Sequence, residues 1–83
     1  MKGVITKISD QWIVKYEKDD DTKYLEIHEK TTEILKKPEY QNLLEEGSEV
    51  DIDFMVVGEI CEDKKFIKKT FAKIKKINNS VLN

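Results

Sequence analysis

The sequence predicts a small, mainly β domain of five strands, with one short helix between the third and fourth strands. Two β-branched runs, 3–8 and 12–17, are separated by only three polar residues, which is typical of a hairpin. Residues 49–57 alternate apolar and polar side chains, which indicates a half-buried strand. The chain has 83 residues, a length that allows a single domain.

The first half of the chain is expected to contain three strands. In the hairpin, Trp12 and Tyr16 fall on one face of the second strand, because alternate residues of a strand share a face. Residues 17–22 are predicted to form a charged turn, since their consecutive aspartates lack the spacing and the glycine of a calcium loop. A third strand is expected over 24–28.

The middle of the chain changes to a helical pattern. Pro38 disrupts a helix interior but is favoured in the first turn of a helix. We therefore expect a short turn over 32–36 and a helix over 38–45. Gly47 supplies a left-handed stop beyond the last helical residues.

The fourth strand has the most regular alternation in the chain. Its apolar face, which we expect in the core, consists of Val50, Ile52, Phe54 and Val56. Asp51 and Asp53 lie on the opposite face, and a connection over 58–65 follows.

The segment 66–77 has two interpretations. As a helix it carries one apolar stripe opposite its lysines, and periodicity alone slightly favours this interpretation. A strand over 70–77 places Ala72 and Ile74 inward and closes a small sheet, and on this topological ground we predict a strand. The domain then covers 1–77, and 78–83 are expected to form a C-terminal tail.

The order of these elements resembles the OB-fold, a five-stranded Greek-key barrel with a helix between its third and fourth strands. Residues 1–8 are similar to the glycine-led first strand of small barrels. Residues 46–54 (Glu-Gly-Ser-Glu-Val-Asp-Ile-Asp-Phe) are similar to the entry into their fourth strand, and 71–74 to the closing strand. More narrowly, the chain resembles small OB-fold-like proteins of phage and bacterial type. The resemblance covers 1–77 and implies a fold rather than an activity.

The side-chain inventory predicts neither a catalytic nor a metal site. His28 is the only histidine and has no nucleophile near it in the sequence. Cys61 is the only cysteine, and the adjacent acids disfavour its thiolate. We therefore expect no enzyme activity, no cofactor and no metal. The single cysteine, with no signal peptide and no apolar membrane span in the sequence, predicts a cytoplasmic protein.

The charges are unevenly distributed along the chain. All 15 basic residues are lysines, and seven of them lie in 64–83, which holds no acid and has a balance of +7. Residues 1–63 hold the other eight lysines and all 17 acids, a balance of -9. The basic segment either meets a polyanion or neutralises the acidic body within the same chain. Lysine supplies a point charge without the bidentate base recognition of arginine.

Two functions follow from these features. The first is weak, sequence-tolerant binding of single-stranded DNA or RNA, through lysines and stacking aromatic side chains. The residues expected to carry it are Trp12, Tyr16, Tyr24, Lys64, Lys65, Lys68, Lys69, Phe71, Lys73 and Lys75. Trp12 and Tyr16 have the alternative role of filling the core.

The second function is protein–protein interaction, as an inhibitor or accessory module of phage type. Here the acidic body docks on a protein partner, because Asp51 and Asp53 repel nucleic acid and favour a basic protein. One structural feature distinguishes the two functions. Binding of nucleic acid requires Phe71 and the lysines to share a face with Trp12 or Tyr16, whereas docking through the acidic body does not.

Overall fold

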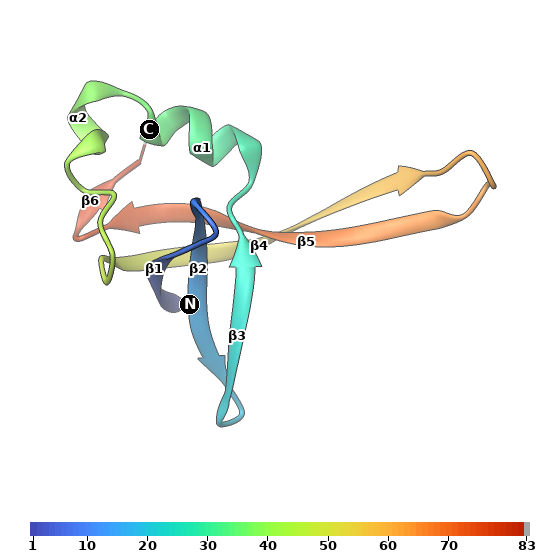
Figure 1. Cartoon of the computed structure of the whole chain (residues 1–83), viewed down its shortest axis with the longest axis horizontal. Coiled ribbons are helices and arrows are strands. Elements are labelled where there is room, and N and C mark those ends of the chain that lie inside the picture. Colours follow the sequence, from blue (N-terminus) through green and yellow to red (C-terminus); the bar gives the residue numbers. More distant parts are fainter. Residues whose placement is uncertain (83) are drawn as a thin grey trace.

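A computed structural model of the chain describes residues 1–82 and arranges them as one antiparallel sheet with two short helices packed beside it (Figure 1). The strands are β1 (Lys2–Ile8), β2 (Gln11–Lys18), β3 (Asp21–Glu26), β4 (Glu49–Ile60), β5 (Phe66–Ile77) and β6 (Ser80–Val81). The helices are α1 (Glu29–Leu35) and α2 (Pro38–Gln41). Along the sheet the strands lie in the order β3-β2-β1-β4-β5-β6.

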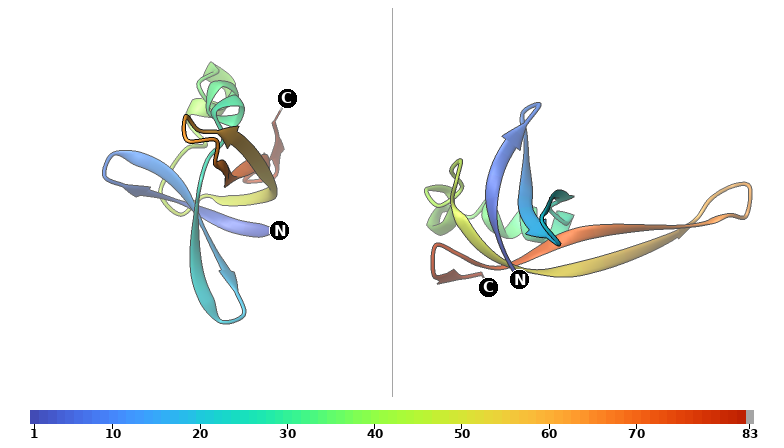
Figure 2. Two further views of the ribbon diagram at one scale, coloured as in Figure 1. Left: turned by 90° about the vertical axis from the view of Figure 1, so that its right-hand side faces the viewer. Right: turned by 90° about the horizontal axis from the view of Figure 1, so that it is seen from below.

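The mainly β class is confirmed, but the expected five-stranded barrel is not. The sheet has a sixth strand and, within residues 1–82, does not close on itself. The chain just after β3 approaches β5 at one isolated parallel bridge, between Ile27 and Ala72. A closed barrel requires a continuous ladder between its first and last strands. The β4–β5 hairpin instead runs away from the other strands (Figure 2).

Tight two-residue turns connect three of the hairpins of the sheet, β1–β2, β2–β3 and β5–β6. The turns at 9–10, 19–20 and 78–79 each consist of two residues with positive φ, the conformation of a type I′ turn. Aspartate and asparagine, which supply five of these six residues, tolerate that conformation better than most side chains. The predicted hairpin of β1 and β2 is thus confirmed.

The other two turns lengthen the sheet beyond the prediction. The charged turn expected over 17–22 is confined to 19–20, so β3 begins at residue 21 rather than 24 and ends at residue 26. The turn at 78–79 brings β6 back onto β5 in the region expected to be a tail. Residue 83, the last of that expected tail, lies outside the described residues.

The first helix begins earlier than expected. α1 starts at Glu29, before the turn predicted over 32–36, and ends at Leu35. His28 caps it, because His28 Nδ1 accepts a hydrogen bond from the Lys30 N–H at 3.2 Å. Histidine is not among the preferred N-cap residues, so the sequence pattern placed the start at the following threonines instead.

The second helix begins where the sequence predicts and ends early. Pro38 is its first residue, and the helix stops at Gln41 rather than at residue 45. Gly47 has the expected positive φ, 85°, but it does not cap this helix. It lies in the turn that enters β4, where its N–H donates to the Ile5 carbonyl at 2.8 Å.

Glu46 fastens the same turn to β1. The Thr6 hydroxyl donates to Glu46 Oε1 at 2.6 Å, and the Lys7 N–H donates to Glu46 Oε2 at 2.8 Å. These two hydrogen bonds, the Thr6 bond first, lower the pKa of Glu46 below its usual value.

The core lies between the helices and the curved part of the sheet. Its buried apolar residues are Ile5, Val14, Leu35, Tyr40, Val50, Ile52, Ala72, Ile74 and Ile77. The register of β4 and β5 shifts between Asp51 and Ile52, which leaves Lys75 as an extra residue on β5. This bulge lets Ile74 and Ile77, three residues apart, both reach the core. The strand predicted over 70–77, with Ala72 and Ile74 inward, is confirmed, and it begins earlier than predicted, at Phe66.

Phe54 and Val56 lie outside this core, so their expected burial is wrong. Phe54 is 44% exposed and Val56 is 58% exposed. β1 pairs with β4 only as far as Asp51, whereas β4 and β5 continue together to Ile60 and from Phe66. The connection expected over 58–65 is therefore shorter and consists of residues 61–65. We call the projecting part of this hairpin, residues 53–73, the arm (Figures 1 and 2).

Within residues 1–82, none of the helices has the length and apolar character needed to cross a membrane.

Candidate functional site

The register of the arm assigns its side chains to two faces, because directly paired residues of antiparallel strands point the same way. One face, here called the apolar face, carries Phe54, Val56, Gly58, Ile60, Phe66, Lys68 and Thr70, with the buried Ala72 at its base. The other, here called the mixed face, carries Asp53, Met55, Val57, Glu59, Ile67, Lys69, Phe71 and Lys73. The arm thus presents two surfaces of different chemistry.

Large apolar side chains are exposed along the apolar face. Besides Phe54 and Val56, Ile60 is 77% exposed and Phe66 is 59% exposed. The Phe66 ring lies directly on the backbone of Gly58, where a Cβ atom would overlap the ring. Glycine therefore allows an aromatic ring to cover the middle of the arm. The Lys68 ammonium lies 5.6 Å from the centroid of the same ring.

The apolar face continues from the base of the arm onto β2. The Tyr16 and Phe54 rings meet edge to face, with 5.6 Å between their centroids. Lys23 of β3 is paired with Tyr16 and lies on the same face of the sheet. Trp12, further along β2, is half-buried and packs against the core. Of the two roles considered for Trp12, packing in the core agrees with this position.

The mixed face packs against the end of β3 and the start of α1. Lys69 Nζ donates to both carboxylate oxygens of Glu26 at 3.0 Å and lies 5.2 Å from the centroid of Phe71. The Phe71 ring meets His28 edge to face, with 5.4 Å between the centroids. The four side chains of these contacts line a cavity of about 530 Å³. Its remaining lining residues are Ile27, Glu29, Val57, Glu59 and Ile67.

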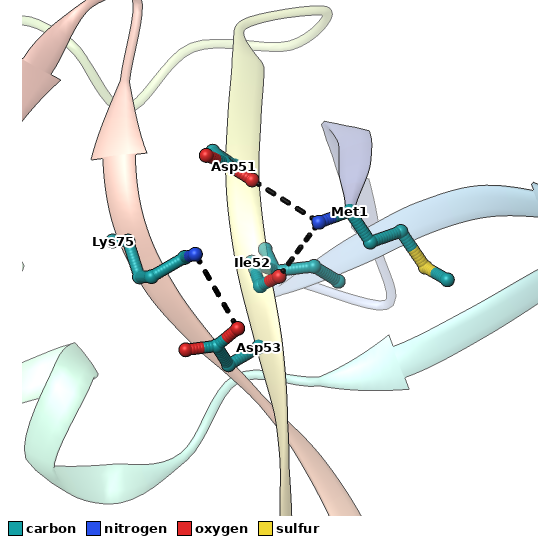
Figure 3. Close-up of polar contacts among 5 residues, drawn as sticks. All are labelled: Met1, Asp51, Ile52, Asp53 and Lys75. Atoms are coloured by element: carbon teal, nitrogen blue, oxygen red, sulfur yellow. Dashed lines mark hydrogen bonds and ion pairs between the residues drawn. The ribbon is translucent and has the colours of Figure 1, made fainter.

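Carboxylates of the same chain neutralise several of the candidate lysines. Lys75 Nζ lies 3.4 Å from Asp53 Oδ1 (Figure 3). Lys73 is the residue directly opposite Asp53 in the register of β4 and β5. Lys65 Nζ lies 3.8 Å from Asp63 Oδ2 in the turn of the arm. On the adjacent part of β4, the amino group of Met1 donates to Asp51 Oδ1 and to the Ile52 carbonyl, both at 3.2 Å (Figure 3).

The residues expected to bind nucleic acid do not form one surface. Phe71, Lys69 and Lys73 lie on the mixed face, opposite the side that carries Trp12 and Tyr16. Tyr24 is 53% exposed and is paired with Lys15 on the opposite side of the sheet from Tyr16. Lys64 and Lys65 lie in the turn at the tip of the arm, and Lys68 alone of the candidate lysines on β5 lies on the apolar face.

Sequence reasoning missed Val56, Ile60 and Phe66 as surface residues. The signal was available, because the period-two alternation of β4 continues through Gly58 to Ile60. A strand longer than the sheet that covers it leaves its last apolar residues exposed.

Comparisons with protein-family models, with curated proteins and with solved structures found no match. Among residues 1–82, no group of three or more His, Cys, Asp or Glu side chains is arranged to hold a metal ion.

Proposed function

We propose that this chain is a non-catalytic, OB-like binding module that docks on a protein partner through the apolar face of its arm. The observation that carries the proposal is the exposure of Phe54, Val56, Ile60 and Phe66 on one face of one hairpin. Contiguous exposed apolar patches mark protein interaction sites, because their exposure to water is unfavourable.

The OB-like part of the proposal is supported by the element order and by the approach of β5 to β3. Beyond β3, Ile27 bridges Ala72, and the His28 N–H donates to the Ala72 carbonyl at 3.0 Å. This contact is parallel and joins the third and the fifth strands, as the closing contact of a Greek-key barrel does.

The arm itself has little to stabilise it in isolation. An isolated two-stranded hairpin is marginally stable in water, and the outer part of this one has no third strand beside it within residues 1–82. Removing an exposed side chain such as Ile60 or Phe66 from water contributes about 1.5–3 kcal/mol when its burial becomes complete. A partner on the apolar face would therefore stabilise the arm as well as the complex.

The acidic body, the docking surface expected from the sequence, has another role in this proposal. Glu26 and Asp53 pair with Lys69 and Lys75. These contacts support neutralisation of the basic segment within the chain.

Single-stranded nucleic acid is the competing partner. It is favoured by the presence of Tyr16, Phe54 and Phe66 with Lys68 on one side of the molecule. It is disfavoured because Val56 and Ile60, which are aliphatic, offer no ring on which a base can stack. The pairing of other lysines with carboxylates also weakens the electrostatic contribution to binding.

The experiment is affinity capture from a lysate of the source cells after nuclease treatment. We expect the wild type and Ile67→Ser, a control on the mixed face of the same arm, to retain one stoichiometric protein. Ile60→Ser should lose it, while its circular-dichroism spectrum stays unchanged. Equal capture by both variants, or loss of the partner on nuclease treatment alone, would contradict the proposal.

A further inference from the structure

The charges around the apolar face indicate the chemistry of its partner. We propose that the apolar face binds an acidic amphipathic protein segment, in which carboxylates flank the apolar side chains. This inference rests on the docking function proposed above and adds the charge of the partner.

Two lysines on this side of the molecule stand without an ion pair in the part of the chain that the structure describes. Lys68 lies on the apolar face, and Lys23 lies beside Tyr16 at the base of the arm. Within residues 1–82, neither lysine has a carboxylate at ion-pair distance. On the mixed face, in contrast, Lys69 is paired with Glu26.

Within residues 1–82, the strands of the arm carry no acid on the apolar face, and the acid that β3 adds on the same side, Asp21, is paired in register with Lys18 across the β2–β3 hairpin. The acids of β4 beyond the core, Asp53 and Glu59, both lie on the mixed face. A partner that covers the apolar face must therefore cover Lys68 as well. An ammonium removed from water requires an opposite charge or a hydrogen-bond acceptor, and a carboxylate supplies both.

A second copy of the chain does not satisfy this requirement through the same surface. Pairing two apolar faces brings lysines together and adds no acid from the strands of the arm, because both copies carry the same residues there. Phosphates of a nucleic acid would satisfy the lysines, but they would leave Val56 and Ile60 without apolar contacts. An amphipathic protein segment satisfies both the lysines and the aliphatic side chains.

The test uses two fluorescently labelled designed peptides. Both have the same Leu and Phe positions at helical spacing, and the remaining positions are Glu and Gln in one peptide and Lys and Gln in the other. Binding is followed by fluorescence anisotropy at low salt. We expect the wild type to bind the acidic peptide roughly tenfold more tightly than the basic one.

Two double variants isolate the charges concerned. Lys23→Glu with Lys68→Glu should reverse the preference between the peptides. Lys15→Glu with Lys36→Glu changes the net charge equally, away from the apolar face, and should preserve the preference. Equal affinities of the wild type for both peptides, or the same change in both double variants, would overturn the inference.

The remaining outcomes separate this inference from the docking function. If both peptides bind equally and Ile60→Ser abolishes both interactions, the docking function stands and the acidic partner is wrong. If Ile60→Ser leaves peptide binding unchanged, the docking function fails as well. A labelled single-stranded oligonucleotide that binds more tightly than the acidic peptide, or a dimer in sedimentation that Ile60→Ser dissociates, would replace the acidic segment as the occupant.

Discussion

At the scale of single residues, burial separates two side chains that the sequence pattern treats as equivalent. Ile52 and Phe54 are alternate residues of β4, and the alternation predicts both in the core. Ile52 is buried, whereas Phe54 is half-exposed and contacts Tyr16. Alternation identifies the face of a strand correctly, but it does not show how far along the strand the core extends.

Ile52→Ala should therefore lower the free energy of unfolding by about 2–5 kcal/mol, the usual cost of a cavity in a well-packed core. Phe54→Ala should cost less, about 1–2 kcal/mol, because its ring already contacts water in the folded state. Urea denaturation of the two variants measures both values. An equal loss would show that Phe54 belongs to the core.

Glu46 should contribute to the pH dependence of stability. Its pKa is lowered in the folded state by the Thr6 and Lys7 hydrogen bonds, so the folded chain favours the carboxylate. The resulting stabilisation is present above the ordinary glutamate pKa and is lost as pH falls through the lowered folded-state pKa. The melting temperature of Glu46→Gln should consequently fall less between neutral and acidic pH than that of the wild type. Thermal melts of both proteins measure this difference. Parallel curves for the two proteins would exclude this role.

At the scale of elements, local signals predicted the turns and the strands better than their ends. The Ser9-Asp10 and Asp19-Asp20 turns follow from side chains that tolerate positive φ. How far the core covers β4 and β5 could not be read in this way, because it depends on where the pairing of β4 with β1 ends, and β1 is distant in sequence. The bulge at Lys75 has the same origin, since it arises from the register of two strands.

The arm should exchange its backbone amides faster than the body, because it is a two-stranded hairpin with little burial. Gly58→Ala should increase the exchange further, since a Cβ atom there displaces the Phe66 ring from the backbone. Hydrogen exchange with mass spectrometry resolves peptides of the arm from those of β1 and β2. Equal protection of arm and body in the wild type would refute this description of the arm.

At the scale of the whole molecule, the sequence predicted the mainly β class and the order of the first five strands, with one helix between the third and fourth strands where the structure has two. It did not predict that the sheet stays open or that the arm projects from it. The sequence shows that acidic and basic residues are segregated along the chain. It does not show which of them form ion pairs, because partners such as Lys69 and Glu26 are far apart in sequence and meet only in the fold. For the same reason, the candidate site was found from the register of the arm rather than from a motif.

The central claim is that the apolar face of the arm contacts a protein. Its most direct test places a photo-crosslinking amino acid at Ile60 or, as the control, at Ile67 on the opposite face, and irradiates the source cells. We predict one crosslinked protein from position 60 and none of that mass from position 67. Crosslinks to nucleic acid from position 60, or the same protein from both positions, would contradict the account.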